Sequence, residues 1–267
     1  MLRQIIRENW THRGQTWFLA VTELRKSVHG ARLGWVWLIL KPAVYVAAFW
    51  FTLAVGLRVV HDQENGASFL VWLATGIFVW QYISAMLVSG SNVYKRYSYL
   101  VIRLKFPLSV ISSFHSLGQL IIFLITQVLL VVIMVLTRTP MTIYLIQWPA
   151  IVLLLHVTFT AYSLATSPLS AISADFHNAI KVSSTPLFWL SGIIFDVSKI
   201  DIVWLRWIFA FNPVTFFAEA LRASTVNQVW VWSDPMLVYP FLIVLAVLVV
   251  FALRVQSRLG SEVADVL

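Results

Sequence analysis

The stretch 108–137 reads L-S-V-I-S-S-F-H-S-L-G-Q-L-I-I-F-L-I-T-Q-V-L-L-V-V-I-M-V-L-T and holds no charged residue. Crossing about 30 Å of hydrocarbon takes about 20 helical residues, so this stretch is long enough to span a membrane. Its apolar residues are continuous rather than alternating, which favours a helix over a strand of a membrane barrel. The stretch therefore predicts an all-α membrane protein.

Five more apolar stretches flank it on both sides. They are residues 36–57, 69–89, 143–170, 178–195 and 236–253. The fifth of the six resulting spans is the shortest, because its uncharged core covers only 182–195 and Lys181 must extend toward the interface to lengthen it. A content of 60% hydrophobic and 11% charged residues agrees with six transmembrane helices, since soluble proteins hold about 25% charged residues.

The positions of the cations predict the orientation of the chain. With both termini in the cytoplasm, 14 of the 19 Lys and Arg residues fall on the inner side and five on the outer side. The acidic residues split five and six, so the cations alone carry the asymmetry, as the positive-inside rule requires. The net charge of +8 thus reflects topology and not nucleic-acid binding. We expect one domain, residues 1–267, with a cytoplasmic interfacial segment 1–35, a six-span bundle 36–253 and a cytoplasmic tail 254–267.

An amphipathic segment precedes the first span. Trp17, Val21, Leu24 and Val28 fall at helical spacing, while cations occupy the other faces. Such a helix can lie flat in the interface, with its apolar side toward lipid and its cations toward anionic headgroups. An ordinary juxtamembrane helix is the alternative.

The loop 92–107 mixes four cations with aromatic and aliphatic residues. A loop that only fixes topology needs the charges alone, whereas apolar side chains among them are typical of a surface that docks onto a partner. Anchoring of the tyrosines at the membrane interface is the alternative.

The segment 200–223 is strongly apolar, yet it carries charges and is broken at Asn212-Pro213. Proline disrupts a helix and restricts the residue before it, so an uninterrupted span is not expected. Two short helices that dip into the outer leaflet fit better, the second with Asn212 as its cap and Pro213 at its first position. Glu219 and Arg222 are three residues apart and can pair on one face. An amphipathic outer loop resting on the membrane is the alternative.

The motifs of several enzyme classes are absent. The chain holds no G-x-x-x-x-G-K-[ST] phosphate loop, no H-E-x-x-H, no G-x-S-x-G and no cysteine, so we expect neither catalysis nor a metal site. His115 and His156 fall within spans without a carboxylate nearby in sequence, which favours a hydrogen-bonded packing role. Aromatic residues in the first two spans belong to packing or interface belts, or line a path for sugars. The candidates for a path are Phe49, Trp50, Phe51, Trp72, Phe78, Trp80 and Tyr82.

Several motifs together resemble the membrane subunit of ABC-2 type exporters of cell-surface polymers, most closely the teichoic-acid export permeases of Gram-positive bacteria. The anchors are L-G-W-V-W-L-I-L-K-P at 33–42, F-W-F-T-L-A-V-G-L-R at 49–58, F-L-V-W-L-A-T-G-I-F-V-W at 69–80, K-F-P-L-S-V-I at 105–111 and F-N-P-V-T-F-F-A-E-A-L-R at 211–222. The similarity covers nearly the whole chain. One departure lies at A-D-F-H-N, 174–178, where the family pattern usually has Arg before the aspartate.

The resemblance implies a homodimer bound to two copies of a separate ABC ATPase, which would hold the ATP and Mg that this chain does not bind. It implies an N-terminal interfacial helix at 15–33, a coupling helix at 94–106 and an outer gate at 200–223. The coupling residues would be Tyr94, Lys95, Arg96, Tyr97, Tyr99, Arg103, Lys105 and Phe106. The gate residues would be Arg206, Asn212, Pro213, Glu219 and Arg222.

The implied function is ATP-driven export or flipping of lipid-linked wall teichoic acid across the bacterial cytoplasmic membrane. Its alternatives are an O-antigen or capsular polysaccharide permease, a small-molecule ABC-2 exporter and, from another class, a membrane transferase acting on lipid-linked sugars.

Overall fold

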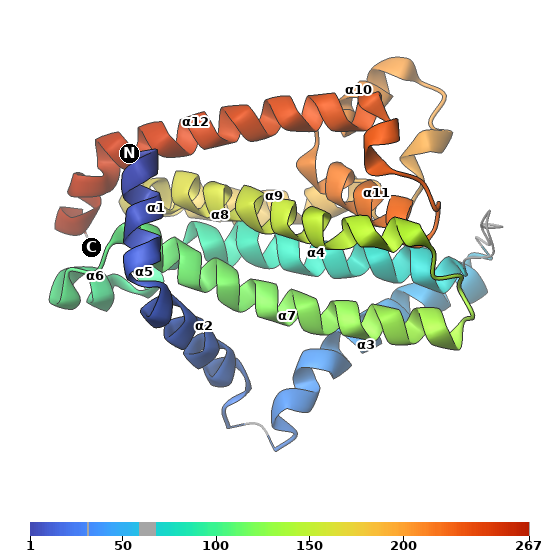
Figure 1. Cartoon of the computed structure of the whole chain (residues 1–267), viewed down its shortest axis with the longest axis horizontal. Helices are drawn as coiled ribbons and strands as arrows, with labels where there is room; N and C mark the ends of the chain where they lie inside the picture. The colour runs from blue at the N-terminus through green and yellow to red at the C-terminus, as the bar shows by residue number, and fades with distance from the viewer. Residues whose placement is uncertain (31, 59–67, 267) are drawn as a thin grey trace.

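A computed structural model describes residues 1–30, 32–58 and 68–266 of the chain, and within them every regular element is a helix. Four long helices build the bundle in Figure 1: α4 (Phe69–Ser91), α7 (Leu108–Leu136), α8 (Trp148–Ile172) and α12 (Pro235–Val266). Among the spans, α4 is the most buried, because α7, α8, α9 and α11 all pack around it. Any movement of α4 therefore displaces the helices that pack around it.

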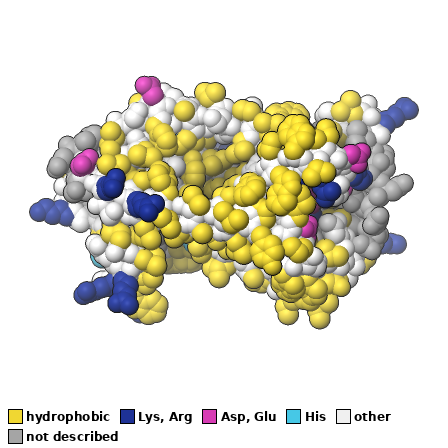
Figure 2. Space-filling model, turned by 90° about the horizontal axis from the view of Figure 1, so that it is seen from above, with side chains coloured by type: hydrophobic (Ala, Val, Ile, Leu, Met, Phe, Trp, Pro, Cys, Tyr) yellow, Lys and Arg dark blue, Asp and Glu magenta, His cyan; other side chains and the backbone are white. Residues whose placement is uncertain are grey.

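Five helices of the described residues are long and apolar enough to cross a membrane. Besides the four long helices they include the first span, in which a short turn (Gly34–Val36) leads into α3 (Trp37–Trp50) and a π-helical end (Phe51–Gly56). Figure 2 shows the matching surface, with hydrophobic side chains over the middle of the molecule and most charged ones at its two ends. The prediction of an all-α membrane protein is confirmed.

The count of six full-length spans is not confirmed. The fifth, α9 (Ala174–Trp189), has only 16 residues and ends before a turn in which Gly192 has a φ of +66°, a conformation that suits glycine. The segment from α9 to the turn after it nevertheless runs back along α4. His177 lies 3.1 Å from Ser91 at the last residue of α4, whereas the Ile193 carbonyl lies beside Gly76 near the start of α4.

The N-terminal segment forms two helices, α1 (Leu2–Thr11) and α2 (Arg13–Val28). The predicted apolar face of α2 is divided in the structure: Leu24 and Val28 are buried in the protein, whereas Trp17 is 58% exposed. The side of α2 that packs on α7 also includes Ala20 and the polar residue Glu23. The lipid contact of α2 stays a prediction.

The two ends of the bundle differ in construction. Both termini lie at the end that holds the short helices α5 (Val93–Arg96) and α6 (Ser98–Leu104), as Figure 1 shows. The expected tail beyond residue 253 continues α12 as a helix to Val266. At the opposite end lie α10 (Val203–Ala210) and α11 (Pro213–Thr225), with single turns at Ile143–Gln147, Val197–Lys199 and Val231–Ser233.

Candidate functional site

The helix α11 begins as the sequence predicts. The Asn212 side-chain oxygen accepts a hydrogen bond of 3.0 Å from the Val214 backbone N–H, and Pro213 occupies the first helical position. The Asn212 amide group also donates to the Leu190 carbonyl at 3.2 Å and to the Ser191 hydroxyl at 2.8 Å. The cap therefore joins the start of α11 to the end of α9, a link that the sequence pattern does not predict.

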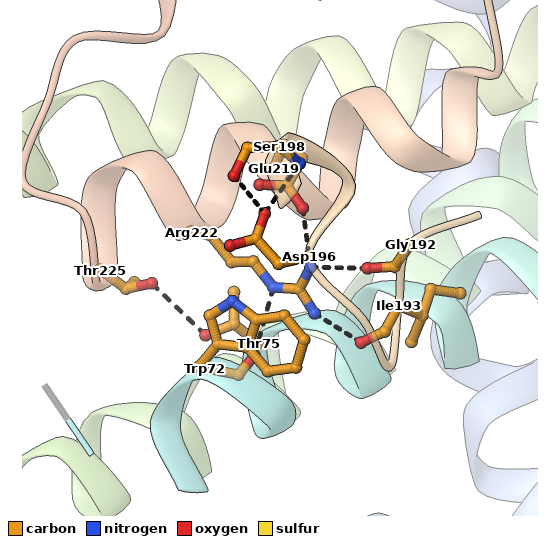
Figure 3. A network of polar contacts seen from close by, with 9 residues as sticks. All are labelled: Trp72, Thr75, Gly192, Ile193, Asp196, Ser198, Glu219, Arg222 and Thr225. Atoms are coloured by element: carbon orange, nitrogen blue, oxygen red, sulfur yellow. Dashed lines mark hydrogen bonds and ion pairs between the residues drawn. The ribbon is translucent and has the colours of Figure 1, made fainter. Parts of the chain in front are cut away.

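Arg222 on α11 is completely buried, and its guanidinium binds three separate segments (Figure 3). Its Nη1 donates to the Gly192 carbonyl at 2.7 Å and to the Glu219 carboxylate at 2.8 Å, and its Nη2 donates to the Ile193 carbonyl. Its Nε makes a longer bond of 3.4 Å to the Trp72 carbonyl. Because a buried charge is tolerated only when it is paired and hydrogen-bonded, this network explains how Arg222 lies in the core.

The guanidinium also stacks on α4. Its central carbon lies 3.6 Å from the centre of the Trp72 ring, a close cation–π contact. Gly76, one turn further along α4, leaves the space that the guanidinium occupies, since a Cβ there would lie 2.5 Å from Nη2. Arg222 thus fastens α11 to α4 and to the turn after α9.

Glu219 supplies the countercharge and faces a cavity. Burial raises the pKa of this carboxyl, and the Arg222 guanidinium opposes the rise, while the charges of Asp196 and Asp234 add to it. The side chain is 19% exposed. The carboxylate is thus the part of the pair that ions or ligands can reach.

The cavity measures ≈ 390 Å³ and lies between the turn after α9, α10, α11 and the start of α12. Charged side chains of both signs line it, namely Asp196, Lys199, Arg206, Glu219 and Asp234. Of the predicted gate residues, Arg206 and Glu219 reach this cavity, while Asn212, Pro213 and Arg222 hold its walls together. The predicted pair of short helices and the Glu219–Arg222 contact are confirmed; the role of these residues as a gate stays a prediction.

The second candidate site is the elbow formed by α5 and α6. Tyr94 and Tyr97, expected on its surface, are buried instead. The Tyr94 hydroxyl accepts a 2.8 Å hydrogen bond from Gln256 on α12 and a 3.4 Å bond from Ser112 on α7. The Tyr97 ring packs edge-on against Phe114, with 4.9 Å between ring centres. These tyrosines anchor the elbow to the bundle and do not form its outer face.

The outer face of the elbow consists of the remaining predicted residues. Lys95, Arg96, Tyr99, Arg103 and Lys105 are exposed, and Phe106 is half-buried against His12 of the N-terminal segment. A face with four cations and one aromatic ring suits an acidic or polar partner surface.

A buried acid–imidazole contact beside the elbow was missed by the sequence analysis. His115 Nδ1 on α7 lies 2.7 Å from the Glu23 carboxylate on α2, and its Nε2 lies 2.9 Å from the Ser89 hydroxyl on α4. Ninety-two positions separate Glu23 from His115, so sequence proximity gave no signal for the pair. His156 has the expected packing role, 3.0 Å from the Ser116 hydroxyl.

The candidate path aromatics do not share one surface. Trp72, Phe78, Trp80 and Tyr82 are buried on α4, where Trp80 packs against Phe188 and Tyr82 against Phe123. On the first span, Phe49 also contacts Phe188, while Trp50 and Phe51 are exposed. Trp72 also lines the cavity beside Glu219, and the role of these aromatic residues as a path stays a prediction. No cluster of three or more metal-ligating side chains occurs within the part of the chain that the structure describes.

Comparison with known proteins gives two kinds of match. The family model described as ABC-2 type transporter matches residues 14–226, which reach from α2 to the end of α11. The O-antigen export system permease protein RfbA of Myxococcus xanthus is 23% identical over 224 residues, which are 82% of this chain and 83% of the relative. The protein of the same name from Klebsiella pneumoniae is 21% identical over 246 residues, or 92% of each chain.

Proposed function

The chain belongs to the ABC-2 type transporter family, and from this premise we propose that it is the permease subunit of an exporter of lipid-linked surface polysaccharide of the O-antigen class. The observation that carries the proposal is the alignment with two O-antigen export permeases over more than four fifths of every chain compared. These relatives support the polysaccharide alternative of the sequence analysis better than its first choice, wall teichoic acid.

The energy for export comes from a partner. Since the sequence has no phosphate-binding loop, ATP and Mg bind to a separate ABC ATPase, and two ATPase subunits serve a homodimer of this chain. The exposed cations of the α5–α6 elbow form the docking surface, and α10 and α11 form the gate at the other end of the bundle.

The helix α4 joins these two sites. It ends at Ser91, two residues before α5 begins, and it carries Trp72 and Gly76 against Arg222 near its start. A packed helix transmits displacement because its neighbours cannot deform continuously. A shift of the elbow on ATP binding is thus carried along α4 to the wall of the gate cavity.

Reconstitution tests the proposal. The permease is co-purified with the ATPase and placed in liposomes with an undecaprenyl-diphosphate-linked O-polysaccharide, a lipid-linked teichoic acid or neither. Selective stimulation of ATP hydrolysis and outward movement of the O-polysaccharide are expected. Stimulation of ATP hydrolysis by teichoic acid alone would instead favour a teichoic-acid exporter. Turnover of a lipid-linked sugar without any ATPase would favour a transferase.

A further inference from the structure

Glu23 is a buried acid at the point where three segments meet. Its side chain is 8% exposed, and its Oε1 lies 2.7 Å from His115 Nδ1 on α7 and 3.6 Å from Arg96 Nη1 on α5. The other oxygen, Oε2, is buried and has no hydrogen-bond partner among the described residues. Tyr97 also lies beside this carboxylate, since burial and the charge of Glu23 raise the pKa of the Tyr97 hydroxyl. An acceptor left open beside Arg96 and Tyr97 indicates an arrangement that is only partly closed.

The contact of Glu23 with α7 is firm. Gly118 of α7 lies beside α2, and a Cβ at 118 would be in ordinary van der Waals contact, 3.5 Å, with both the Ala20 carbonyl and Glu23 Oε2. His115 is fully buried and is held on its other side by Ser89 of α4 at 2.9 Å. Glu23 is therefore fixed to α7 directly and to α4 through His115.

The contact of Glu23 with α5 is loose by comparison. A separation of 3.6 Å is too long for a hydrogen bond, and the Arg96 side chain is 51% exposed. A guanidinium donates through a planar fork that fits both oxygens of one carboxylate. Shortening the 3.6 Å separation by less than about 1 Å would bring Arg96 Nη1 within hydrogen-bond distance of Oε1, and the second arm of the fork is then available for Oε2.

We propose that Glu23 is a positioning residue for energy coupling, onto which Arg96 closes when the partner ATPase moves the elbow. In the open state Arg96 makes the long contact to Oε1; in the closed state it bridges both oxygens and ties α5 to α2, α7 and α4. Each state is stabilised by a different set of contacts, as a two-state element requires. This inference rests on the proposed function, and it removes Arg96 from the docking surface.

The contact itself is tested without any partner. The chain has no cysteine, so spin labels attach only at Ser27→Cys and Ser98→Cys; the two single-label variants give the distances between protomers of the homodimer, and the remaining distance in the double-label variant is that of α2 from α6. In the permease alone, Arg96→Gln and Glu23→Gln are expected to broaden the distance distribution, while Lys95→Gln, which removes the neighbouring exposed cation, leaves it unchanged. Distributions identical to that of the parent in both variants would overturn the proposal even if the chain exports polysaccharide.

The role in coupling is tested in the complex with the ATPase. Glu23→Gln, Arg96→Gln and the double variant are expected to retain the ATPase on purification, yet to lower the export per ATP hydrolysed by about tenfold. The double variant should be no worse than the poorer single one, because both remove one contact. Additive losses, or loss of the ATPase from Arg96→Gln alone, would contradict closure of Arg96 onto Glu23. Arg96 would then belong to the surface that docks the ATPase.

A conservative variant distinguishes a two-oxygen bridge between Arg96 and Glu23 from simple charge pairing of the two side chains. Arg96→Lys keeps the charge but cannot bridge two oxygens in one plane, so it is expected to behave like Arg96→Gln. Coupling equal to that of the parent chain would overturn the bridged closed state. If no ATPase co-purifies with any variant, the proposed function fails, while the spin-label result still decides whether Arg96 and Glu23 hold the elbow. Glu262→Gln, exposed on α12, serves as the acidic control.

Discussion

The Arg222 guanidinium on α11 stacks 3.6 Å from the centre of the Trp72 ring on α4 and pairs with Glu219 at 2.8 Å. Two carbonyls of the turn after α9 take the remaining strong hydrogen bonds. One side chain therefore joins α4, α9 and α11 at the wall of the gate cavity, where loosening any one contact affects all three segments.

Replacing Arg222 tests this junction. Arg222→Ala leaves Glu219 buried without its countercharge, and breaking a buried pair in this way costs about 3–5 kcal/mol. Thermal unfolding in detergent should show a midpoint lowered by about 10 °C. Arg222→Lys should recover only part of the loss, because an ammonium cannot lie flat on Trp72 and bind three carbonyl-type acceptors at once. Arg254→Gln, exposed on α12, is the control, and an equal fall there would argue against a specific junction.

Gly76→Ala should disturb the same junction from the side of α4. The added Cβ would lie 2.5 Å from Arg222 Nη2 and 2.9 Å from the Ile193 carbonyl, so the guanidinium must move. A loss of about 1–3 kcal/mol is expected, as for other overpacked sites. Gly260→Ala is the matched control: its nearest neighbour is 4.0 Å away, and alanine favours a helix over glycine by about 0.5–1 kcal/mol. Equal midpoints for the two variants would show that the space beside Gly76 is not needed.

Two substitutions at Asn212 separate its two tasks. Asn212→Asp keeps an oxygen for the Val214 N–H but loses the donor to Leu190 and Ser191, whereas Asn212→Ala loses both. Hydrogen exchange should therefore rise in 190–196 for both variants, but at the start of α11 only for alanine, whose lost cap costs about 1 kcal/mol. Identical exchange patterns in the two variants would mean that the cap and the link to α9 are not separable.

The sequence is sufficient to predict the parts of this fold that depend on local patterns. Continuous apolar runs predict the long helices, and Asn212-Pro213 predicts both the break and the start of α11, because capping and proline geometry act within a few residues. The Glu219–Arg222 pair follows from helical spacing in the same way.

The contacts between distant segments are what sequence patterns cannot supply. Arg222 is charged and would be expected at a surface, yet it is buried because carbonyls of the turn after α9 happen to converge on it. Glu23 lies among cations on α2, and only the packing of α2 on α7 brings it to His115. The sequence pattern predicts an interface role for Tyr94. In the structure its hydroxyl instead accepts a hydrogen bond from Gln256, which lies far along the chain.

Glu219→Gln should impair export while the permease still assembles. The amide oxygen can accept the hydrogen bond from Arg222, and the carbonyl bonds of Arg222 remain, so the fold survives. The cavity, however, loses one of the three acidic side chains that line it. Surface polysaccharide on cells that produce the variant measures export, and size-exclusion chromatography of the purified variant measures assembly. Normal export would remove Glu219 from the gate, and aggregated protein would assign it to folding instead.

Charge reversal on the elbow tests the docking surface. Lys95, Arg103 and Lys105 are exposed, whereas Arg96 is set aside because it contacts Glu23. If these three cations meet acidic residues of the ATPase, replacing them together by Glu should weaken docking by about tenfold or more, since juxtaposed like charges oppose association. For the parent complex, rising salt should also lower the amount of ATPase retained, because exposed charges are screened.

Arg258→Glu, at the same end of the bundle, is the control for a general change in charge. The triple variant could instead retain the ATPase at low and high salt alike. That result would show that apolar contacts of Tyr99 and Phe106 hold the partner, and that the cations serve topology alone.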